Sequence, residues 1–142
     1  MIISIASGKG GTGKTLVATS LALSIGENVQ LLDCDVEEPN SHIFLKPAIR
    51  ESRVVTVPVP EVDKDKCSHL GMCAGICAYH AIAVTNKSVT VFPELCHGCG
   101  VCSYFCPEKA ITEVDYPIGI VEEGNSNGLD YAGGRLSIGQ PM

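Results

Sequence analysis

The chain has 142 residues, a formal net charge of −6, and 45% hydrophobic residues, with a mean hydropathy of +0.22 and an isoelectric point of about 5.1. It is long enough for an ordinary folded domain and too apolar for a disordered tail. No cluster of Lys and Arg is present, which argues against nucleic acid or an anionic membrane as a partner. No apolar run is long enough to span a bilayer.

The N-terminus combines a short apolar run with a glycine-rich motif. Residues 2–6 predict a buried strand that ends before Ser7. The pattern G-x-x-x-x-G-K-[ST] follows at Gly8, Lys9, Gly10, Gly11, Thr12, Gly13, Lys14 and Thr15. In such a loop the backbone N–H groups surround phosphate oxygens, Lys14 neutralises the β- and γ-phosphates, and the Thr15 hydroxyl binds Mg²⁺. The alternative is a glycine-rich turn without a ligand. A strand before the motif and a helix after it favour the phosphate loop.

A helix is predicted from about Lys14 to Ile25, because apolar residues recur on one face at Leu16, Val17, Leu21 and Ile25. Gly26 is a natural end for it. A second buried strand is predicted at 29–32 and is followed by Asp33-Cys34-Asp35. Carboxylates at this end of a strand lie where α/β sheets bind ligands, although a solvated loop is the simpler interpretation. Cys34 is expected to be a small buried thiol.

Seven of the eight cysteines lie between residues 67 and 106, in two copies of one spacing. The second copy reads C-x2-C-x2-C-x3-C-P from Cys96 to Pro107, the spacing of bacterial ferredoxins. There, three thiolates of one loop bind one cluster and the fourth cysteine binds the other cluster. The complete ligand set of one [4Fe–4S] cluster is therefore predicted to be Cys96, Cys99, Cys102 and Cys77.

The first copy lies 29 positions earlier, with Cys67 in the place of Cys96, and it has lost one ligand: Leu70 stands where the second copy has Cys99. Cys67, Cys73 and Cys106 remain for the second site. That site could hold a [3Fe–4S] cluster, a four-iron cluster with an outside ligand, or nothing. His69 is adjacent to Leu70 and could turn toward the site as a ligand. Neighbouring side chains of an extended loop point apart, however, so we expect His69 to be a solvated loop residue.

The cysteines have two other interpretations, disulfides and zinc. The chain starts at Met1 without a leader, which predicts a reducing, cytoplasmic location where cysteines more often bind metals than form disulfides. Zinc sites favour paired C-x2-C knuckles, whereas triplets followed by a lone cysteine and a proline favour iron–sulfur clusters.

The remaining segments are less specific. Residues 41–50 predict a short helix or turn, and residues 54–59, which contain Pro58, predict an edge strand or a linker. Strands are predicted at 81–84 and 89–92, between the cluster loops. The C-terminal segment predicts strands at 118–122 and 135–138 joined by a loop, with a flexible tail as the alternative. The predicted fold class is α/β: a partial P-loop domain with a parallel sheet and an inserted α+β ferredoxin-like domain. The predicted domains are 1–60, 61–115 and 116–142.

The G-K-G-G-T-G-K-T loop and the D-C-D-V-E-E-P-N segment that begins at Asp33 resemble the MinD/ParA/nitrogenase-iron-protein class of P-loop ATPases, whose Walker A motif is called deviant. The chain is most similar to members with an inserted two-cluster ferredoxin domain. The resemblance implies that Lys9 reaches the nucleotide of a partner in a homodimer and that Asp35 orients the attacking water. Asp33 would lie near the Mg²⁺ ion that Thr15 binds. Because the chain stops after Gln140-Pro141-Met142, we expect it to be the N-terminal portion of such a protein.

Three functions follow as hypotheses. The first is an ATPase that binds Mg-ATP and couples its hydrolysis to the iron–sulfur module, for electron transfer or for delivery of clusters or metals to a protein partner. The second is a ferredoxin-type electron carrier with a non-functional partial nucleotide site. The third is a cluster scaffold in which the incomplete site exchanges its cluster.

Overall fold

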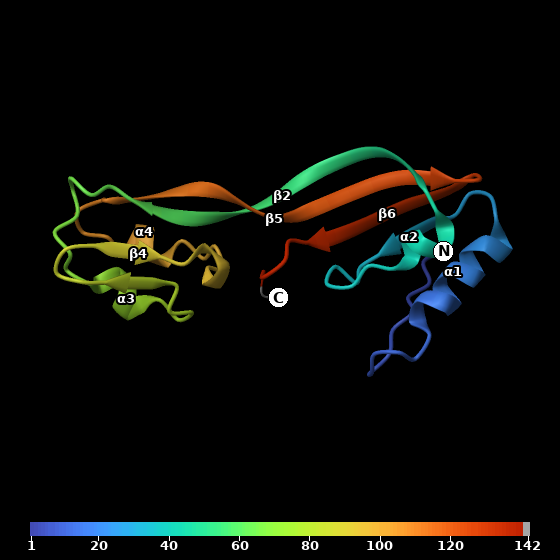
Figure 1. Cartoon of the computed structure of the whole chain (residues 1–142), viewed down its shortest axis with the longest axis horizontal. Coiled ribbons are helices and arrows are strands. Elements are labelled where there is room, and N and C mark those ends of the chain that lie inside the picture. The colour runs from blue at the N-terminus through green and yellow to red at the C-terminus, as the bar shows by residue number, and fades with distance from the viewer. Residues whose placement is uncertain (141–142) are drawn as a thin grey trace. The chain divides into compact units, whose positions relative to one another are not determined.

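The computed structural model describes residues 1–140 (Figure 1). Short helices alternate with a few strands, two of which are long. In chain order the elements are α1 (Lys14–Ile25), β1 (Gln30–Asp33), α2 (Ser41–Leu45), β2 (Ala48–Val62), α3 (Met72–Ile76), β3 (Ile82–Val84), β4 (Val89–Val91), the 3₁₀ helix η1 (Pro93–Leu95), α4 (Val101–Tyr104), β5 (Ile111–Ser126) and β6 (Leu129–Leu136). Strands and helices are thus mixed along the chain, as the α/β prediction requires.

The chain forms two compact units. Unit 1 consists of Met1–Val54 and Gly119–Leu136, and unit 2 consists of Val55–Ile118 with residues 137–140. The long strands β2 and β5 each contribute one part to each unit. The segment with the glycine-rich loop therefore belongs to unit 1, and the seven clustered cysteines belong to unit 2.

The sheet of unit 1 contains a parallel strand pair. Strand β1 pairs in parallel with β6, with Leu31 opposite Tyr131, and β6 pairs antiparallel with β5. The strand order is β1-β6-β5-β2. A parallel pair needs a long connection, and here the connection between β1 and β6 includes Val55–Ile118, which is most of unit 2. Strand β6 thus brings the chain back to the sheet that contains β1.

The core of unit 1 is small. It consists of Ala22, Leu31, Leu45, Leu129 and Tyr131, with Ala18 and Val29 packed against it. Helix α1 has the predicted bounds and ends at Gly26, whose φ of 81° suits glycine. The predicted buried face of this helix is wrong: Leu16, Val17, Leu21 and Ile25 are exposed, and Thr19 and Ala22 are buried instead. The reason is that the sheet approaches the opposite side of the helix, where small residues allow close contact.

The predicted strand at residues 2–6 is also wrong. This segment is irregular and largely exposed, with Ile2 95% accessible. A strand is stable only when a neighbour satisfies its backbone N–H and C=O groups. Within residues 1–140, strand β1 has β6 as its one neighbour in the sheet, and no strand pairs with residues 2–6. The strand predicted at 29–32 does form as β1, although only Leu31 of its four residues is buried.

The C-terminal segment forms a hairpin where a loop was predicted. Strands β5 and β6 meet at Asn127 and Gly128, whose φ angles are 50° and 89°. An Asn-Gly pair with both φ angles positive is the turn that best matches the twist of two antiparallel strands. The prediction of a loop from 123 to 134 missed this signal, and the alternative of a flexible tail is wrong.

Unit 2 carries the two cysteine loops and a small hairpin. Strands β3 and β4 form this hairpin as predicted, with Ile82 opposite Val91. Ala81 and Ala110, which occupy equivalent positions in the two copies of the repeat, are each only 1% exposed. Residues 54–59 lie within β2, at the edge of the four-stranded sheet, which confirms the edge-strand interpretation.

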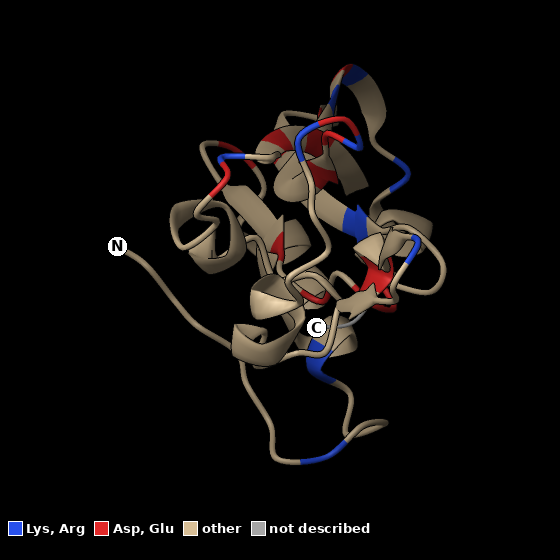
Figure 2. Cartoon of the chain, turned by 90° about the vertical axis from the view of Figure 1, so that its left-hand side faces the viewer, with Lys and Arg blue, Asp and Glu red and all other residues tan. Residues whose placement is uncertain are grey.

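Acidic and basic residues both occur at several places along the chain (Figure 2). One ion pair joins Arg53 to Glu123 at 3.2 Å and another joins Lys66 to Asp63 at 2.9 Å. These side chains are exposed, so the pairs add little stability. Among residues 1–140, no helix has the length and apolar character needed to cross a membrane.

We expect Leu129→Ala to lower the free energy of unfolding by about 2–5 kcal/mol, because it leaves a cavity in a small core. Leu129 is only 2% exposed. The matched control is Leu32→Ala, which alters a strand residue that is 61% exposed and should change stability little. Urea unfolding followed by circular dichroism measures both variants. Equal losses for the two would contradict the described core.

Candidate functional site

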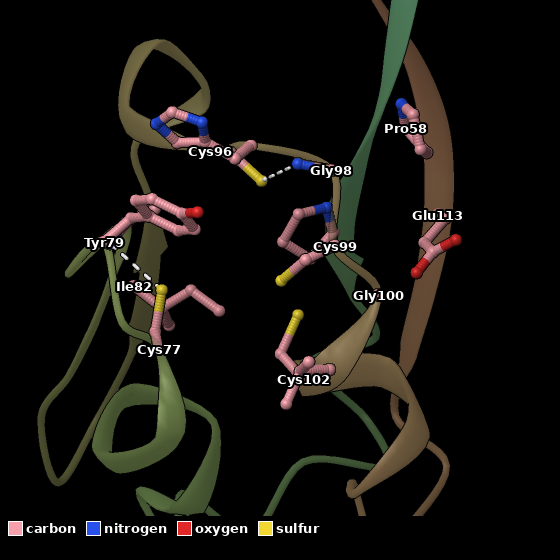
Figure 3. Close-up of a pocket in the computed structure, with 14 residues that line it drawn as sticks. Pro58, Cys77, Tyr79, Ile82, Cys96, Gly98, Cys99, Gly100, Cys102 and Glu113 are labelled. Carbon is pink, nitrogen blue, oxygen red and sulfur yellow. Dashed lines mark hydrogen bonds between the residues drawn. The ribbon is translucent and has the colours of Figure 1, made fainter.

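Four cysteines of unit 2 surround a common hollow (Figure 3). Cys77, Cys96, Cys99 and Cys102 line a space of about 410 Å³, part of which is open solvent, and their sulfur atoms face one another across it. Cys96 and Cys99 come from the loop before α4, and Cys102 lies in the first turn of α4 itself. Cys77 directly follows helix α3 of the other copy. The structure thus brings together the four residues predicted to bind the complete cluster.

Left-handed backbone conformations curve the loop around this hollow. Gly98 has a φ of 63° and Gly100 a φ of 71°. A β-carbon at Gly98 would lie 3.1 Å from two atoms of Pro58, so a side chain is unfavourable there for reasons of space as well as conformation. The N–H of Gly98 points back to the sulfur of Cys96 at 3.5 Å. Two glycines therefore allow cysteines that are close in sequence to face one space.

The remaining three cysteines surround a second hollow. Cys67, Cys73 and Cys106 line about 380 Å³ of space, together with residues that include His69, Leu70 and Glu108. Leu70 is 67% exposed. The three cysteines that the repeat assigned to the second site therefore lie around one space, and Leu70 lines it in the place of a fourth cysteine.

The expectation for His69 rested on an extended loop, and this premise is wrong. His69 has a φ of 61°, in the left-handed region. It is partly buried and lines the second hollow. The alternation of side chains in an extended segment therefore does not apply at this position.

A side-chain pair from the two copies lies beside each hollow. At the first hollow, the ring of Tyr79 stacks on the ring of His97 with centroids 3.8 Å apart. At the second, the hydroxyl and the backbone N–H of Ser68 donate to the carboxylate of Glu108, the latter at 2.7 Å. The hydrogen bond from the hydroxyl, followed by that from the backbone, lowers the pKa of this carboxyl. The two pairs occupy equivalent positions. His97 and Ser68 each directly follow the first cysteine of their copy, and Tyr79 and Glu108 each lie two positions after the last cysteine of the other copy.

These two pairs are not among the features predicted from the sequence. The 29-residue shift that relates the cysteines also relates Ser68 to His97 and Tyr79 to Glu108. Applying the shift to the residues between the ligands would have identified both pairs. The residue types differ so strongly between the copies that similarity of sequence alone does not reveal the equivalence.

Backbone N–H groups donate hydrogen bonds to cysteine sulfurs beside both hollows, an arrangement that suits sulfur ligands of an iron–sulfur cluster. The N–H of Ala81 donates to the sulfur of Cys77 at 3.3 Å, and the N–H of Ala110 donates to the sulfur of Cys106 at 3.4 Å. Such bonds stabilise a ligating thiolate. Within residues 1–140 no group of side chains converges closely enough for a single metal ion.

Burial disfavours the charged form of two of these thiols. It raises the pKa of Cys73 and of Cys102, and neighbouring cysteine sulfurs raise it further. Thiolates close together repel one another, and a bound cation removes that repulsion. Because a ligating thiol must lose its proton, binding of a metal centre at these sites would be coupled to release of protons.

The glycine-rich loop is the main feature of unit 1. Residues 8–13 form turns and bends that lead directly into α1, and Gly13 caps the helix with a φ of 86°. The hydroxyl of Thr12 donates to the hydroxyl of Ser7 at 2.7 Å, and the hydroxyl of Ser7 donates to the carbonyl of Lys9 at 2.8 Å. A β-carbon added at any glycine of the loop meets no other atom within 4 Å. Hydrogen bonds between residues of the loop itself hold its shape. No other part of the described chain lies close to its glycines.

The carboxylates after β1 have local partners. Asp33 accepts hydrogen bonds from the hydroxyl of Ser41 at 2.5 Å and from its N–H at 3.1 Å, at the start of α2. Asp35 is exposed, and its N–H donates to Asp33 at 3.1 Å. Cys34 is exposed, so the expectation of a buried thiol is wrong. The short strand β1 ends before Cys34, and the chain leaves the core there.

Comparison with known proteins identifies the family. The model of the CobQ/CobB/MinD/ParA nucleotide-binding domain matches residues 3–130. Uncharacterized protein MJ0578 of Methanocaldococcus jannaschii is 33% identical over 144 residues, which cover 99% of this chain and 50% of that protein. Protein MJ0579 of the same organism is 31% identical over 111 residues, 72% of this chain and 38% of that protein. The chain thus spans about half the length, or less, of these two relatives.

A third relative matches a shorter stretch. Pyruvate synthase subunit PorD of Methanothermobacter marburgensis is 38% identical over 52 residues, 37% of this chain and 60% of that subunit. The resemblance to the MinD/ParA class is confirmed by the family match, which covers most of the chain. The chain belongs to the CobQ/CobB/MinD/ParA nucleotide-binding family.

Proposed function

We propose that this chain is part of an ATP-binding iron–sulfur protein, in which a P-loop ATPase acts on a ferredoxin-like module formed by residues 61–115. The observation that carries the proposal is the grouping of seven cysteines around two hollows in a member of a nucleotide-binding family. The coupled task would be electron transfer or delivery of clusters or metals to another protein. Similarity to a subunit of pyruvate synthase supports a role beside redox enzymes.

The cluster assignments rest on the lining of the two hollows. Cys77, Cys96, Cys99 and Cys102 would hold a [4Fe–4S] cluster. Cys67, Cys73 and Cys106 would hold a second cluster, of three irons or of four. When bound, such clusters accept and release single electrons at a potential that their surroundings set.

The nucleotide assignments rest on the loop and its family. The N–H groups of residues 8–15 would surround the phosphates, with Lys14 on the β- and γ-phosphates and Thr15 on Mg²⁺. Lys9 would reach the nucleotide of a second copy of the full-length protein. Asp35 would orient water and Asp33 would lie near Mg²⁺. One carboxylate oxygen of Asp33 already accepts two hydrogen bonds from Ser41. A role near Mg²⁺ would therefore use the other oxygen or require these hydrogen bonds to break.

A second candidate function is a ferredoxin-type electron carrier or cluster scaffold whose nucleotide site does not work. The open, exposed loop and the engaged carboxylate of Asp33 favour it. The two candidates differ in one measurable respect, which is whether the chain binds Mg-ATP.

We expect Lys14→Ala to weaken Mg-ATP binding about tenfold or more, because one charged hydrogen bond contributes about 1.5–3 kcal/mol. Titration calorimetry of the anaerobically reconstituted chain measures this affinity. Lys87→Ala, which removes a charge from the β3–β4 turn, serves as the control. Equal affinity of Lys14→Ala and the unaltered chain would contradict the nucleotide assignment, and absence of binding in both would favour the second candidate.

We expect Cys99→Ser to remove most of the iron and sulfide of the first site, because it replaces one of four converging thiols. Iron and sulfide analysis and visible absorbance after reconstitution measure the loss. Cys34→Ser is the matched control, since Cys34 is also exposed but lies in unit 1, away from both hollows. If both variants bound the same amount of iron, the cluster assignment would be wrong.

A further inference from the structure

The second hollow has three cysteines and one position without a ligating side chain. Leu70 occupies that position, is 67% exposed, and has no atom that can bind iron. Its neighbour His69 is partly buried and lines the same hollow. The imidazole is a ligand for iron and replaces cysteine in some clusters.

The backbone at His69 is the same as at its equivalent in the first hollow. The 29-residue shift relates His69 to Gly98 and Gly71 to Gly100. The φ angles are 61° and 63° in the first pair and 80° and 71° in the second. The two loops therefore curve in the same way around their hollows.

What differs is the residue in the left-handed conformation. Glycine adopts it without steric cost, whereas a residue with a β-carbon is strained there. The second loop uses glycine, and the first loop places histidine at the same point, beside the missing ligand. A strained residue that persists at such a site is a reason to look for a function.

The other polar side chains near this corner are engaged. Both carboxylate oxygens of Glu108 accept hydrogen bonds from Ser68, the residue before His69. This contact fastens the loop to the segment after Cys106. Within residues 1–140, no hydrogen bond involves the ring of His69, so both ring nitrogens are available for a ligand.

We propose that His69 supplies the fourth ligand of a four-iron cluster held by Cys67, Cys73 and Cys106, in the place that Leu70 leaves open. A neutral imidazole nitrogen donates its lone pair to the iron that has no cysteine. This inference rests on the proposed binding of clusters by the two hollows. Replacement of a thiolate by a neutral imidazole also removes one negative charge, which raises the reduction potential of this cluster above that of the all-cysteine site.

The test compares the unaltered chain with His69→Gly after anaerobic reconstitution. Glycine suits a positive φ, so this variant removes the ring without straining the loop. The control is His80→Gly, because His80 also has a positive φ of 52° but does not line either hollow. The readouts are iron content, the electron paramagnetic resonance signal of an oxidised three-iron cluster, and the coupling of the reduced cluster to isotopically labelled histidine nitrogen.

The unaltered chain and His80→Gly should contain about eight irons, show nitrogen coupling and lack the three-iron signal. His69→Gly should contain about seven irons, lose the coupling and gain the three-iron signal. Adding Leu70→Cys to His69→Gly should restore a four-iron cluster, which shows that the loop is still folded. A three-iron signal in the unaltered chain, or an unaltered spectrum in His69→Gly, would overturn the assignment of His69 alone. Absence of iron from every variant would overturn the proposed cluster binding itself.

Discussion

The curvature of the two cysteine loops is the constraint on which the rest of unit 2 depends. Cysteines with two residues between them face a common space only if the backbone between them turns sharply. In each copy of the repeat, two residues with a positive φ at equivalent positions produce that turn. In the second loop both residues are glycine, and Gly98 also lies against Pro58 of β2. The helices α3 and α4 begin where the turns end, and each is followed within two residues by the lone cysteine of its copy. The cysteines of each hollow thus come from both halves of the repeat.

The repeat preserves this framework while the residues around it diverge. At the first hollow an aromatic pair, Tyr79 and His97, lies beside the sulfurs, and at the second hollow the equivalent pair is Ser68 and Glu108. A stacked pair excludes water, whereas a carboxylate adds negative charge and attracts water. Because hydrogen bonds, charge and solvent exposure tune a metal centre, the two hollows would offer different surroundings to a bound cluster. The loss of a cysteine at Leu70 increases this difference.

Unit 1 is organised by the parallel pairing of β1 with β6, which joins segments on either side of the cysteine repeat. Its core is small, and α1 leaves large apolar side chains such as Leu16 and Leu23 exposed. The family relatives are about twice as long as this chain or more. In this unit the glycine-rich loop forms turns and bends that lead into α1, and the carboxylate of Asp33 accepts two hydrogen bonds from Ser41 at the start of α2.

The sequence by itself determined the features that depend on local spacing and backbone chemistry. The cysteine spacing and the 29-residue repeat predicted which sulfurs share a hollow, and Gly26 predicted the end of α1. Only the tertiary structure decided which face of α1 is buried, that residues 2–6 lack a partner strand, and that His69 lies at the second hollow. These depend on neighbours that are distant in sequence, or on a φ angle that a histidine rarely adopts, and neither can be read from the order of residues alone. The Asn127-Gly128 turn is different, because its local signal was present in the sequence and was missed.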